Sequence, residues 1–573
     1  MQKSLHLLLV ASTCQAAVFV PGTWTLDQQG LTGVSAILMT VVSENKVVVL
    51  DRVEHNALQV DGHVAWATEL DRINTTLRPL DPTSNTWCST GGFLSNGTMI
   101  STGGNPVVIT GDNGLQAVRL FTPCDDNTCD FWENQNTTRL TSKRWYPSSL
   151  RVQDGSIMIM GGSFDQAYFN NVTYNNPTYE FFPPKNINGF NGTQIPIQLL
   201  IDSEGANQFP NMHLLPDGNI FMAANNRSIL FDWRTNTEIK RLPFIPNGVK
   251  ISSPFSGSAV LLPLNPENNY QPEIFICGGS DLPDFEPLSF YTINDPASNQ
   301  CLRMTLTPEG IQKGWEVEHM PQGRTMLNMN LLPDGRVVIV NGAQSGIAAY
   351  DTVSDRVGES NAANPAFQAV VYNPSAPSGQ RFSTDGIPVS TIARMYHSVA
   401  TLTPFGDIML AGSNPNADVS ILPPFPTEYR VEFLAPPYIV EDRPTYNGLP
   451  QTIPYGSDFK LSVHLPPNTT SVSVSLMDLG FSTHGVTMDQ RLVKLLVTLS
   501  TDHRSVVISA PPNANIYPPG PAYLFLLTDK GVPSIAKKTI IGTGESPPVD
   551  WAASANLLLA TPAAVLNYSD PTL

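Results

Sequence analysis

Four short stretches of the sequence carry side chains that can bind a metal ion or take part in redox chemistry. They are WCSTGG with Cys88, KRWYPSS with Tyr146, ARMYHS with Tyr396 and His397, and FSTHGVTMDQR with His484. Tyr396 and His397 are adjacent, and neighbours in a regular strand point to opposite faces. A single tyrosine or histidine at the start of a strand is more often packed in the core than bound to a metal. The chemistry therefore depends on whether the surrounding elements bring the four stretches together.

The elements around these stretches follow a repeat. Each unit has an apolar strand, a turn that is usually Asx-Gly, a second apolar strand and often a Gly-rich exit. The units begin at Ser35, Cys88, Ser148, Asn211, Gly257, Asn328 and His397, and their turns recur with a loose period of 50 to 71 residues. Paired strands at such a period are typical of propeller blades of the kelch type. We predict an all-β chain in which residues 18–427 form a seven-bladed kelch-type β-propeller.

After Pro426 the repeat stops and the sequence changes to short strands with Pro-rich links, such as TEYRVEFLAPPYI and FKLSVHLPP. This pattern predicts an immunoglobulin-like β-sandwich over residues 428–545. The remaining residues, 546–573, are rich in Pro, Ala and Ser. We expect them to form a tail that lies along the surface or is disordered.

The N-terminus reads MQKSLHLLLVASTCQAA, with a basic residue, an apolar core and then small residues. This order predicts a signal peptide over residues 1–17 and a secreted, extracellular protein. N-x-S/T sequons are compatible with glycosylation, and they lie at Asn74, Asn96, Asn136, Asn171, Asn191, Asn226, Asn468 and Asn567. No later stretch reaches the roughly 18 apolar residues of a membrane span. The net charge of -17 disfavours nucleic acid and anionic membranes as partners. We also expect the protein to be a monomer.

The cysteine count is informative because one cysteine is left over. Of the six cysteines, Cys14 falls in the predicted signal peptide. Cys124 and Cys129 are close enough in sequence for a local disulfide, and Cys277 with Cys301 could close a longer loop. This economical pairing leaves Cys88 as the odd cysteine. It is either a buried thiol that acts as a small hydrophobic side chain or the site of another modification.

Together, the four stretches resemble the copper radical oxidases, the family of galactose oxidase and, more closely, glyoxal oxidase. The resemblance runs from about residue 20 to 545 and rests on WCSTGG, RWYPSS, the NNPTYEFFPP run from Asn175, RMYHS and THGVTMDQR. The fold that it implies, a seven-bladed propeller followed by a sandwich domain, agrees with the repeat. It also implies that Tyr146, axial Tyr396, His397 and His484 bind one copper ion. A thioether between Cys88 and the ring of Tyr146 is implied as well, which would account for the odd cysteine.

The implied ligand set has two imidazoles and two phenolate oxygens, which suits Cu(II), whereas zinc prefers a more tetrahedral site and has no redox chemistry. At the inner edge of a blade the strand is ending, so Tyr396 and His397 need not keep the regular pleat and both can turn toward the metal. His484 is expected to come from a loop of the sandwich domain that reaches into the pore.

The resemblance also implies a mechanism. Oxidation of an alcohol or a hydrated aldehyde removes two electrons, while copper cycles by one, so the cross-linked Tyr146 is the second one-electron centre. Tyr396 is the implied general base for the substrate hydroxyl. Dioxygen accepts the electrons and leaves as H2O2, which peroxidases could consume. The expected substrates are small aldehydes, glyoxal and methylglyoxal, oxidised as gem-diols to carboxylic acids.

Two further residues are predicted substrate contacts. Galactose oxidase has a Trp after the Gly-Gly-Ser that follows the cross-linked Tyr, whereas this stretch reads GGSFDQ and places Phe164 there. Gln344, in NGAQSG, falls where the relatives keep a substrate-contacting Gln. Two other functions remain open: a copper radical alcohol oxidase that acts on primary alcohols or galactose, and a non-catalytic propeller that binds glycans or proteins. The joint presence of the cysteine, the two tyrosines and the two histidines favours an enzyme.

Overall fold

The fold was obtained as a computed structural model, which describes residues 22–51, 54–106 and 111–562. The predicted signal peptide and Asn567 lie outside the described residues. The chain is all-β, as expected, with few helices: α1 (Gln198–Asp202), α2 (Pro308–Lys313) and α3 (Trp551–Ala560) are the α-helices of the described part. Within that part, no helix is long and apolar enough to cross a membrane.

Seven antiparallel sheets follow one another along the first three quarters of the chain. The first contains β2 (Leu38–Val41), β3 (Lys46–Leu50), β6 (Ala67–Asp71) and β7 (Leu77–Leu80). The second sheet contains β8 (Thr90–Phe93), β9 (Met99–Thr102), β10 (Val118–Phe121) and β11 (Phe131–Trp132). The third contains β12 (Ser148–Arg151), β13 (Ile157–Met160), β14 (Thr178–Phe182) and β17 (Ile195–Pro196). The fourth contains β18 (Asn211–Leu214), β19 (Ile220–Ala224), β20 (Arg227–Asp232) and β21 (Thr237–Arg241). The fifth sheet contains β22 (Ser258–Leu261), β23 (Glu273–Cys277), β24 (Gln300–Thr305) and β25 (Glu316–His319). The sixth contains β26 (Asn328–Leu331), β27 (Val337–Val340), β30 (Val370–Tyr372) and β31 (Phe382–Ser383). The last contains β32 (Val399–Leu402), β33 (Ile408–Ala411), β34 (Arg430–Ala435) and β1 (Thr25–Leu31).

Each repeated segment of the sequence forms the first hairpin of one sheet, as its paired apolar runs predict. The first strands β2, β8, β12, β18, β22, β26 and β32 are buried along their whole length. Consecutive first strands from β8 to β32 are neighbours, and β32 also lies beside β2. The start of every first strand is therefore brought toward a common centre.

The last sheet joins the two ends of this series. β1 pairs antiparallel with β34, so that Thr25 lies opposite Ala435, and β34 also pairs with β33. The segment TEYRVEFLAPPYI was expected in the second region, but its strand belongs to this last sheet, which corrects the expected start of the second region at residue 428. An isolated apolar strand does not reveal its partner, because strand pairing is a long-range contact.

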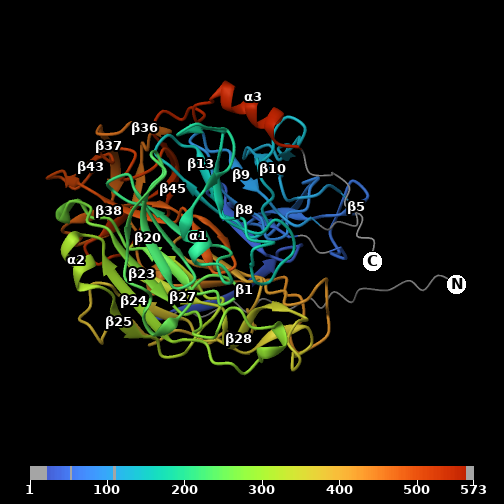
Figure 1. Cartoon of the computed structure of the whole chain (residues 1–573). Helices are drawn as coiled ribbons and strands as arrows, with labels where there is room; N and C mark the ends of the chain where they lie inside the picture. The colour runs from blue at the N-terminus through green and yellow to red at the C-terminus, as the bar shows by residue number, and fades with distance from the viewer. Residues whose placement is uncertain (1–21, 52–53, 107–110, 563–573) are drawn as a thin grey trace.

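The second region contributes two sheets. One contains β35 (Thr445–Asn447), β37 (Asp458–His464), β43 (Ser505–Ser509) and β42 (Val497–Leu499). The other contains β36 (Thr452–Ile453), β45 (Lys537–Ile541), β44 (Gly520–Thr528), β38 (Val472–Asp478) and β41 (Arg491–Leu495). Apolar side chains of both sheets, such as Leu461 and Leu524, share one buried cluster. These strands, orange to red in Figure 1, gather on one side of the molecule.

One hairpin of the second region leaves its own sheets. β39 (Phe481–Thr483) and β40 (Val486–Met488) extend the first sheet, where β39 pairs with β2. β39 also lies beside β8 and β32, and β40 lies beside β12, β18, β22 and β26. The hairpin therefore occupies the centre around which the first strands are arranged.

In the described part of the chain, three further pairs of strands lie outside these sheets. They are β4 (Gln59–Val60) with β5 (His63–Val64), β15 (Asn186–Ile187) with β16 (Phe190–Asn191), and β28 (Ala343–Tyr350) with β29 (Ser360–Pro365). The described part of the tail contains α3, which lies on the outer surface beside β10 in Figure 1. Arg139 holds the end of α3 by donating to the carbonyls of Leu558 and Thr561.

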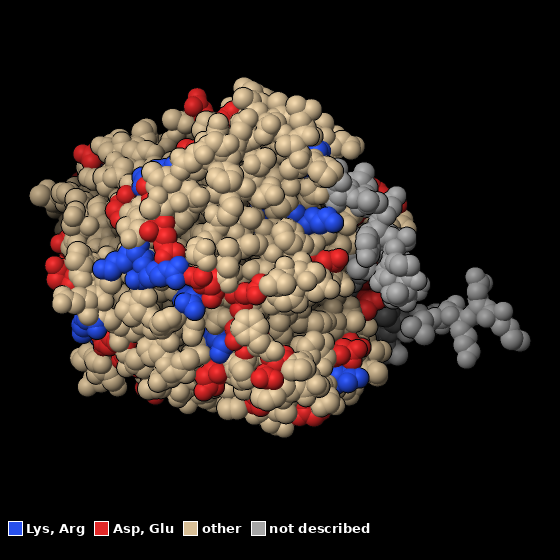
Figure 2. All heavy atoms as spheres, in the orientation of Figure 1, with Lys and Arg blue, Asp and Glu red and all other residues tan. Residues whose placement is uncertain are grey.

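The cysteines pair as the sequence indicates. Cys124 is bonded to Cys129, and Cys277 is bonded to Cys301 across the neighbouring strands β23 and β24. Cys88 is buried and is in neither disulfide. On the face shown in Figure 2, charged side chains are sparse and both signs occur among a largely uncharged surface.

Candidate metal centre

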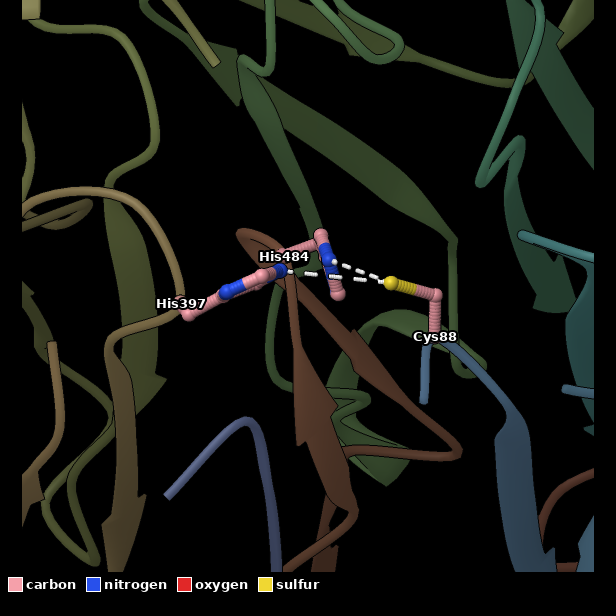
Figure 3. A group of neighbouring side chains, drawn as sticks. All are labelled: Cys88, His397 and His484. Carbon is pink, nitrogen blue, oxygen red and sulfur yellow. Dashed lines mark hydrogen bonds between the residues drawn. The ribbon is translucent and has the colours of Figure 1, made fainter. Parts of the chain in front are cut away.

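Cys88, His397 and His484 converge from three distant segments of the chain. The Cys88 Sγ atom lies 3.5 Å from Nε2 of His484 and 3.9 Å from Nε2 of His397. Figure 3 shows the three side chains pointing toward one another. All three are buried, and among the described residues they form the group of His, Cys, Asp or Glu side chains arranged closely enough to hold a metal ion.

The two predicted tyrosine ligands complete this site. The hydroxyl groups of Tyr146 and Tyr396 are in direct hydrogen-bonding contact. The Tyr146 ring lies edge-on to His484 at a centroid distance of 5.0 Å, and the Tyr396 ring stacks on His397 at 3.8 Å. The backbone N–H of Tyr146 donates to the carbonyl of Cys88 at 3.1 Å. The structure thus brings together all five residues that the sequence motifs single out.

An unusual backbone conformation places these residues. Cys88, Tyr146 and His397 each precede the first strand of a sheet by two positions and have φ values of 58°, 62° and 59°. Non-glycine residues rarely adopt this left-handed conformation. The same feature recurs before the other first strands from β18 to β26, at Phe209, Ser256 and Met326. The turn at His397 breaks the strand alternation, which explains how adjacent Tyr396 and His397 both face the site.

His484 is placed by the tip of the β39–β40 hairpin. Thr483 pairs with Val486, which leaves His484 and Gly485 as a two-residue turn with φ values of 49° and 83°. Positive φ at both central residues defines the tight type I′ turn that suits the twist of a hairpin. A Cβ atom on Gly485 would lie 2.9 Å from the carbonyl oxygen of Leu327. The turn therefore needs glycine for its conformation and for its close approach to the neighbouring sheet.

Hydrogen bonds fix the orientation of both imidazoles. Nδ1 of His397 lies 2.9 Å from the carbonyl oxygen of Asn414, so Nδ1 must carry the proton. The indole N–H of Trp87 donates to Nε2 of His397 at 3.3 Å, in agreement with this tautomer. Nδ1 of His484 lies 2.6 Å from Oγ1 of Thr483, whose own hydroxyl donates to the carbonyl of Ile37. Both histidines therefore present the Nε2 lone pair toward the cluster.

Burial controls the charges in the site. It lowers the pKa of His397 to about 3 and lowers the pKa of His484 well below its ordinary value, so both imidazoles are neutral. Burial, aided by Cys88, raises the pKa of Tyr146 and of Tyr396 well above 10. Desolvation thus disfavours every charged form of these groups. A bound cation would favour the phenolate forms and would coordinate the neutral imidazoles, so the donor set fits a metal ion.

The two predicted substrate contacts lie outside this cluster. Phe164 is half-buried, and its backbone N–H donates to the carbonyl of Tyr174. Among the described residues, the rings in contact with Tyr146 are Trp145, Phe209 and His484. Gln344 is half-buried in β28. Both residues stay predictions.

Sequence reasoning missed several aromatic residues around the site. Phe209 stacks on His484 at 4.5 Å, and Trp87 donates to His397. Tyr350 stacks on Trp87, and Tyr168 lies edge-on to Tyr350. Trp87 has a signal in the sequence, because it precedes Cys88 in WCSTGG. Phe209, Tyr168 and Tyr350 lie in segments without a comparable pattern.

Comparison with known families agrees with this site. The family model described as Glyoxal oxidase N-terminus matches residues 37–438, and the model described as Galactose oxidase-like, Early set domain matches residues 443–541. The chain belongs to the glyoxal oxidase family. It is therefore an oxidoreductase.

Individual relatives extend over almost the whole chain. Aldehyde oxidase GLOX of Vitis pseudoreticulata is 33% identical over 561 residues, which cover 92% of this chain and 99% of that protein. Aldehyde oxidase GLOX1 of Arabidopsis thaliana is 31% identical over 557 residues, covering 90% of this chain and 84% of that protein.

A solved structure shares the fold. It is a fungal alcohol oxidase of the AA5 family in complex with copper, which superimposes with a TM-score of 0.68 and covers 91% of this chain and 100% of its own. The sequence identity is 17%, so this likeness establishes the fold alone.

Proposed function

We propose that this protein is a secreted copper radical oxidase that oxidises small aldehydes, as their gem-diols, to carboxylic acids and reduces O2 to H2O2. One observation carries the proposal: two phenols and two imidazoles converge in one buried site, with a cysteine beside them. A propeller that only binds glycans or proteins would not need this set of groups at its centre.

The ion would be held by Tyr146, Tyr396, His397 and His484. Their donors are two phenol oxygens in mutual contact and the unprotonated Nε2 atoms of the two histidines. Nε2 of His397 accepts the Trp87 N–H in this structure and would exchange that hydrogen bond for the ion. Imidazole nitrogen and phenolate oxygen are ligands that suit Cu(II). Copper bound there would exchange one electron and lower the pKa of the coordinating phenols.

The protein's own groups would carry the rest of the reaction. Tyr396 is the proposed general base, which accepts the proton of a substrate hydroxyl at its Oη atom. Tyr146, cross-linked to Cys88 by a thioether, is the proposed second one-electron centre, which takes a hydrogen atom from the diol carbon. One diol and one O2 give one carboxylic acid and one H2O2, because two electrons and two protons pass to O2.

The substrate class is proposed from the named relatives, of which two are called aldehyde oxidases. Phe164 and Gln344 are the proposed substrate contacts, and a phenyl ring lacks the N–H donor with which an indole could bind a sugar. The solved alcohol oxidase of the same fold supports a second candidate, the oxidation of primary alcohols or galactose to aldehydes. Both candidates use an H–C–O–H unit, so the pocket must decide between them.

Oxygen uptake and peroxide formation on a panel of substrates separate the candidates. We expect the copper-loaded enzyme to give a higher kcat/KM with glyoxal or methylglyoxal than with primary alcohols or galactose. A clearly higher kcat/KM with an alcohol would make the protein an alcohol oxidase. Metal analysis should find about one copper per chain, and His484→Ala should lose both copper and turnover. Full activity in a copper-free preparation would refute the copper proposal.

The thioether is tested by peptide mapping of the active enzyme after reduction. The peptides that contain Cys88 and Tyr146 should be recovered as one linked species, lighter by two hydrogens than their sum, because a thioether resists reduction and a disulfide does not. Alkylation of Cys88 as an ordinary thiol in active, copper-loaded enzyme would contradict the cross-link.

We propose further that the seven sheets from β2 to β34 are the blades of a kelch-type propeller, with β1 as the outer strand of the last blade. The two sheets from β35 to β45 would then form an immunoglobulin-like sandwich. The N-terminal signal pattern and the exposed sequons, such as Asn74 and Asn136, support secretion and glycosylation. The proposed product, H2O2, would be available to extracellular peroxidases, and we propose that the protein acts as a monomer.

A further inference from the structure

Two tyrosines border the metal centre. Tyr168 lies in the loop between β13 and β14, and Tyr350 is the last residue of β28. Both are half-buried, whereas Tyr396 and His397 are only 2% and 1% exposed. The same loop carries Phe164 and the same strand carries Gln344, so the two segments that hold the proposed substrate contacts also hold these tyrosines.

Tyr350 packs against residues of the metal centre and against Trp87. Its ring stacks on Trp87 at a centroid distance of 5.7 Å and an interplanar angle of 10°. It also lies 6.3 Å from the Tyr396 ring and 6.4 Å from the His397 ring. Trp87 in turn donates its indole N–H to His397. Tyr350 is thus held in a fixed position beside the proposed general base.

Tyr168 packs edge-on against Tyr350, with a centroid distance of 6.3 Å and an interplanar angle of 89°. Burial raises the pKa of Tyr168 to about 12, and hydrogen bonding from Tyr350 offsets part of this rise. The Tyr350 ring thus lies 6.3 Å from both the Tyr168 ring and the Tyr396 ring.

A hydrated aldehyde differs from a primary alcohol by one hydroxyl group. One hydroxyl of the diol gives its proton to Tyr396 in the proposed reaction, and the second would lose its hydrogen bonds to water if the pocket offered none. A tyrosine hydroxyl can both donate and accept, and a site that pairs a substrate hydroxyl discriminates against an analogue that lacks it. We infer that the Tyr168–Tyr350 hydroxyl pair binds the second hydroxyl of the gem-diol and so selects hydrated aldehydes over alcohols.

This inference rests on the proposed function, but it can be tested without turnover. Trifluoroacetone hydrate is a gem-diol with no hydrogen on the diol carbon, so the enzyme cannot oxidise it. The matched ligand is the tertiary alcohol in which a methyl group replaces one of the two hydroxyls. Titration calorimetry on the copper-loaded enzyme gives the dissociation constant of each ligand. We expect the wild type to bind the diol about tenfold more tightly, which is the size of one net hydrogen bond.

Tyr350→Phe and Tyr168→Phe remove one hydroxyl each and keep the ring packing. Each variant should lose most of the preference for the diol, and its kcat/KM ratio of glyoxal to a primary alcohol should fall about tenfold. Tyr179→Phe is the matched control, because the Tyr179 hydroxyl donates to Asn236 in a different cluster. The absorption spectrum of bound copper should be the same in all three variants, which shows that the centre is intact.

Unchanged diol preference in both variants would overturn the inference, as would equal binding of the two ligands by the wild type. If the wild type oxidises no aldehyde yet prefers the diol through these tyrosines, the proposed function fails and the diol site stands. If one variant does not fold, the other still decides, because each removes a different member of the pair.

Discussion

At the scale of single residues, the centre depends on groups that hold the ligands rather than on the ligands alone. The Thr483 hydroxyl oxygen accepts a hydrogen bond from the Nδ1–H of His484, and the hydroxyl donates its own hydrogen bond to the carbonyl of Ile37. This arrangement selects one tautomer of an imidazole that can adopt two. A metal-binding histidine whose second nitrogen loses its partner binds the metal more weakly, because the ring is no longer oriented.

Thr483→Val should therefore weaken copper binding by about 10- to 100-fold. The measurement is competition for copper against a chelator of known affinity. Thr487→Val is the control, since Thr487 lies on the same hairpin, is buried, and its hydroxyl has no hydrogen-bond partner in the described structure. Equal copper affinity of the two variants would show that Thr483 does not orient His484.

At the scale of elements, the β39–β40 hairpin is the critical part. It belongs by sequence to the second region but completes the centre formed by the first. The role of the hairpin tip can be tested by comparing two glycines of similar backbone conformation, of which Gly485 lies at the tip and Gly531 lies elsewhere. Gly485 and Gly531 have φ values of 83° and 77°, but a Cβ would meet the Leu327 carbonyl at the first and nothing within 4 Å at the second.

Gly485→Ala and Gly531→Ala should share a loss of about 1–2 kcal/mol from the left-handed backbone. Gly485→Ala should lose more, because the added methyl group pushes the tip away from Leu327 and displaces His484. We expect this variant alone to bind copper more weakly. Urea denaturation measures the stabilities and chelator competition the affinities, and an unchanged copper affinity in Gly485→Ala would contradict this account of the tip.

The elements also show how far a sequence can predict this protein. The hairpins were predictable because each carries its own turn residues and paired apolar runs. The role of β34 was not, since a strand does not encode which distant strand it will join. The five residues that converge at the centre could be singled out from motifs such as RMYHS, whereas Tyr168 and Tyr350 reach its border through the long-range packing of a loop and of β28. The approach of Tyr350 to Tyr396 is a tertiary contact that a local sequence pattern does not encode.

At the scale of the whole molecule, burial of neutral histidines makes stability depend on pH. The pKa values of His397 and His213 are both lowered to about 3, mainly by burial. His213 also faces the positive charge of Arg491. Between pH 6.5 and about 3 an unfolded chain binds protons that these folded histidines cannot bind. Each of them therefore lowers the stability as the pH falls through this range.

We expect the unfolding free energy of the metal-free protein to decrease from pH 6.5 toward pH 4. Asp489, whose pKa burial raises to about 6, opposes this trend in part. Comparing the wild type with His213→Gln cancels the contributions of the other titratable groups. The unfolding free energy of the wild type should fall by about 1.4 kcal/mol per pH unit more than that of the variant. Parallel pH profiles in urea denaturation would show that His213 does not stay neutral when folded.

The position of His484 along the chain has a consequence for biosynthesis. Cys88 and His484 are 396 residues apart, and a nascent chain emerges from the ribosome with its N-terminus first. The early sheets can form while the hairpin that carries His484 is still untranslated. A partly made chain therefore has the cysteine and both tyrosines but lacks the last imidazole. The proposed metal centre can therefore be completed only after nearly the whole polypeptide has been synthesised.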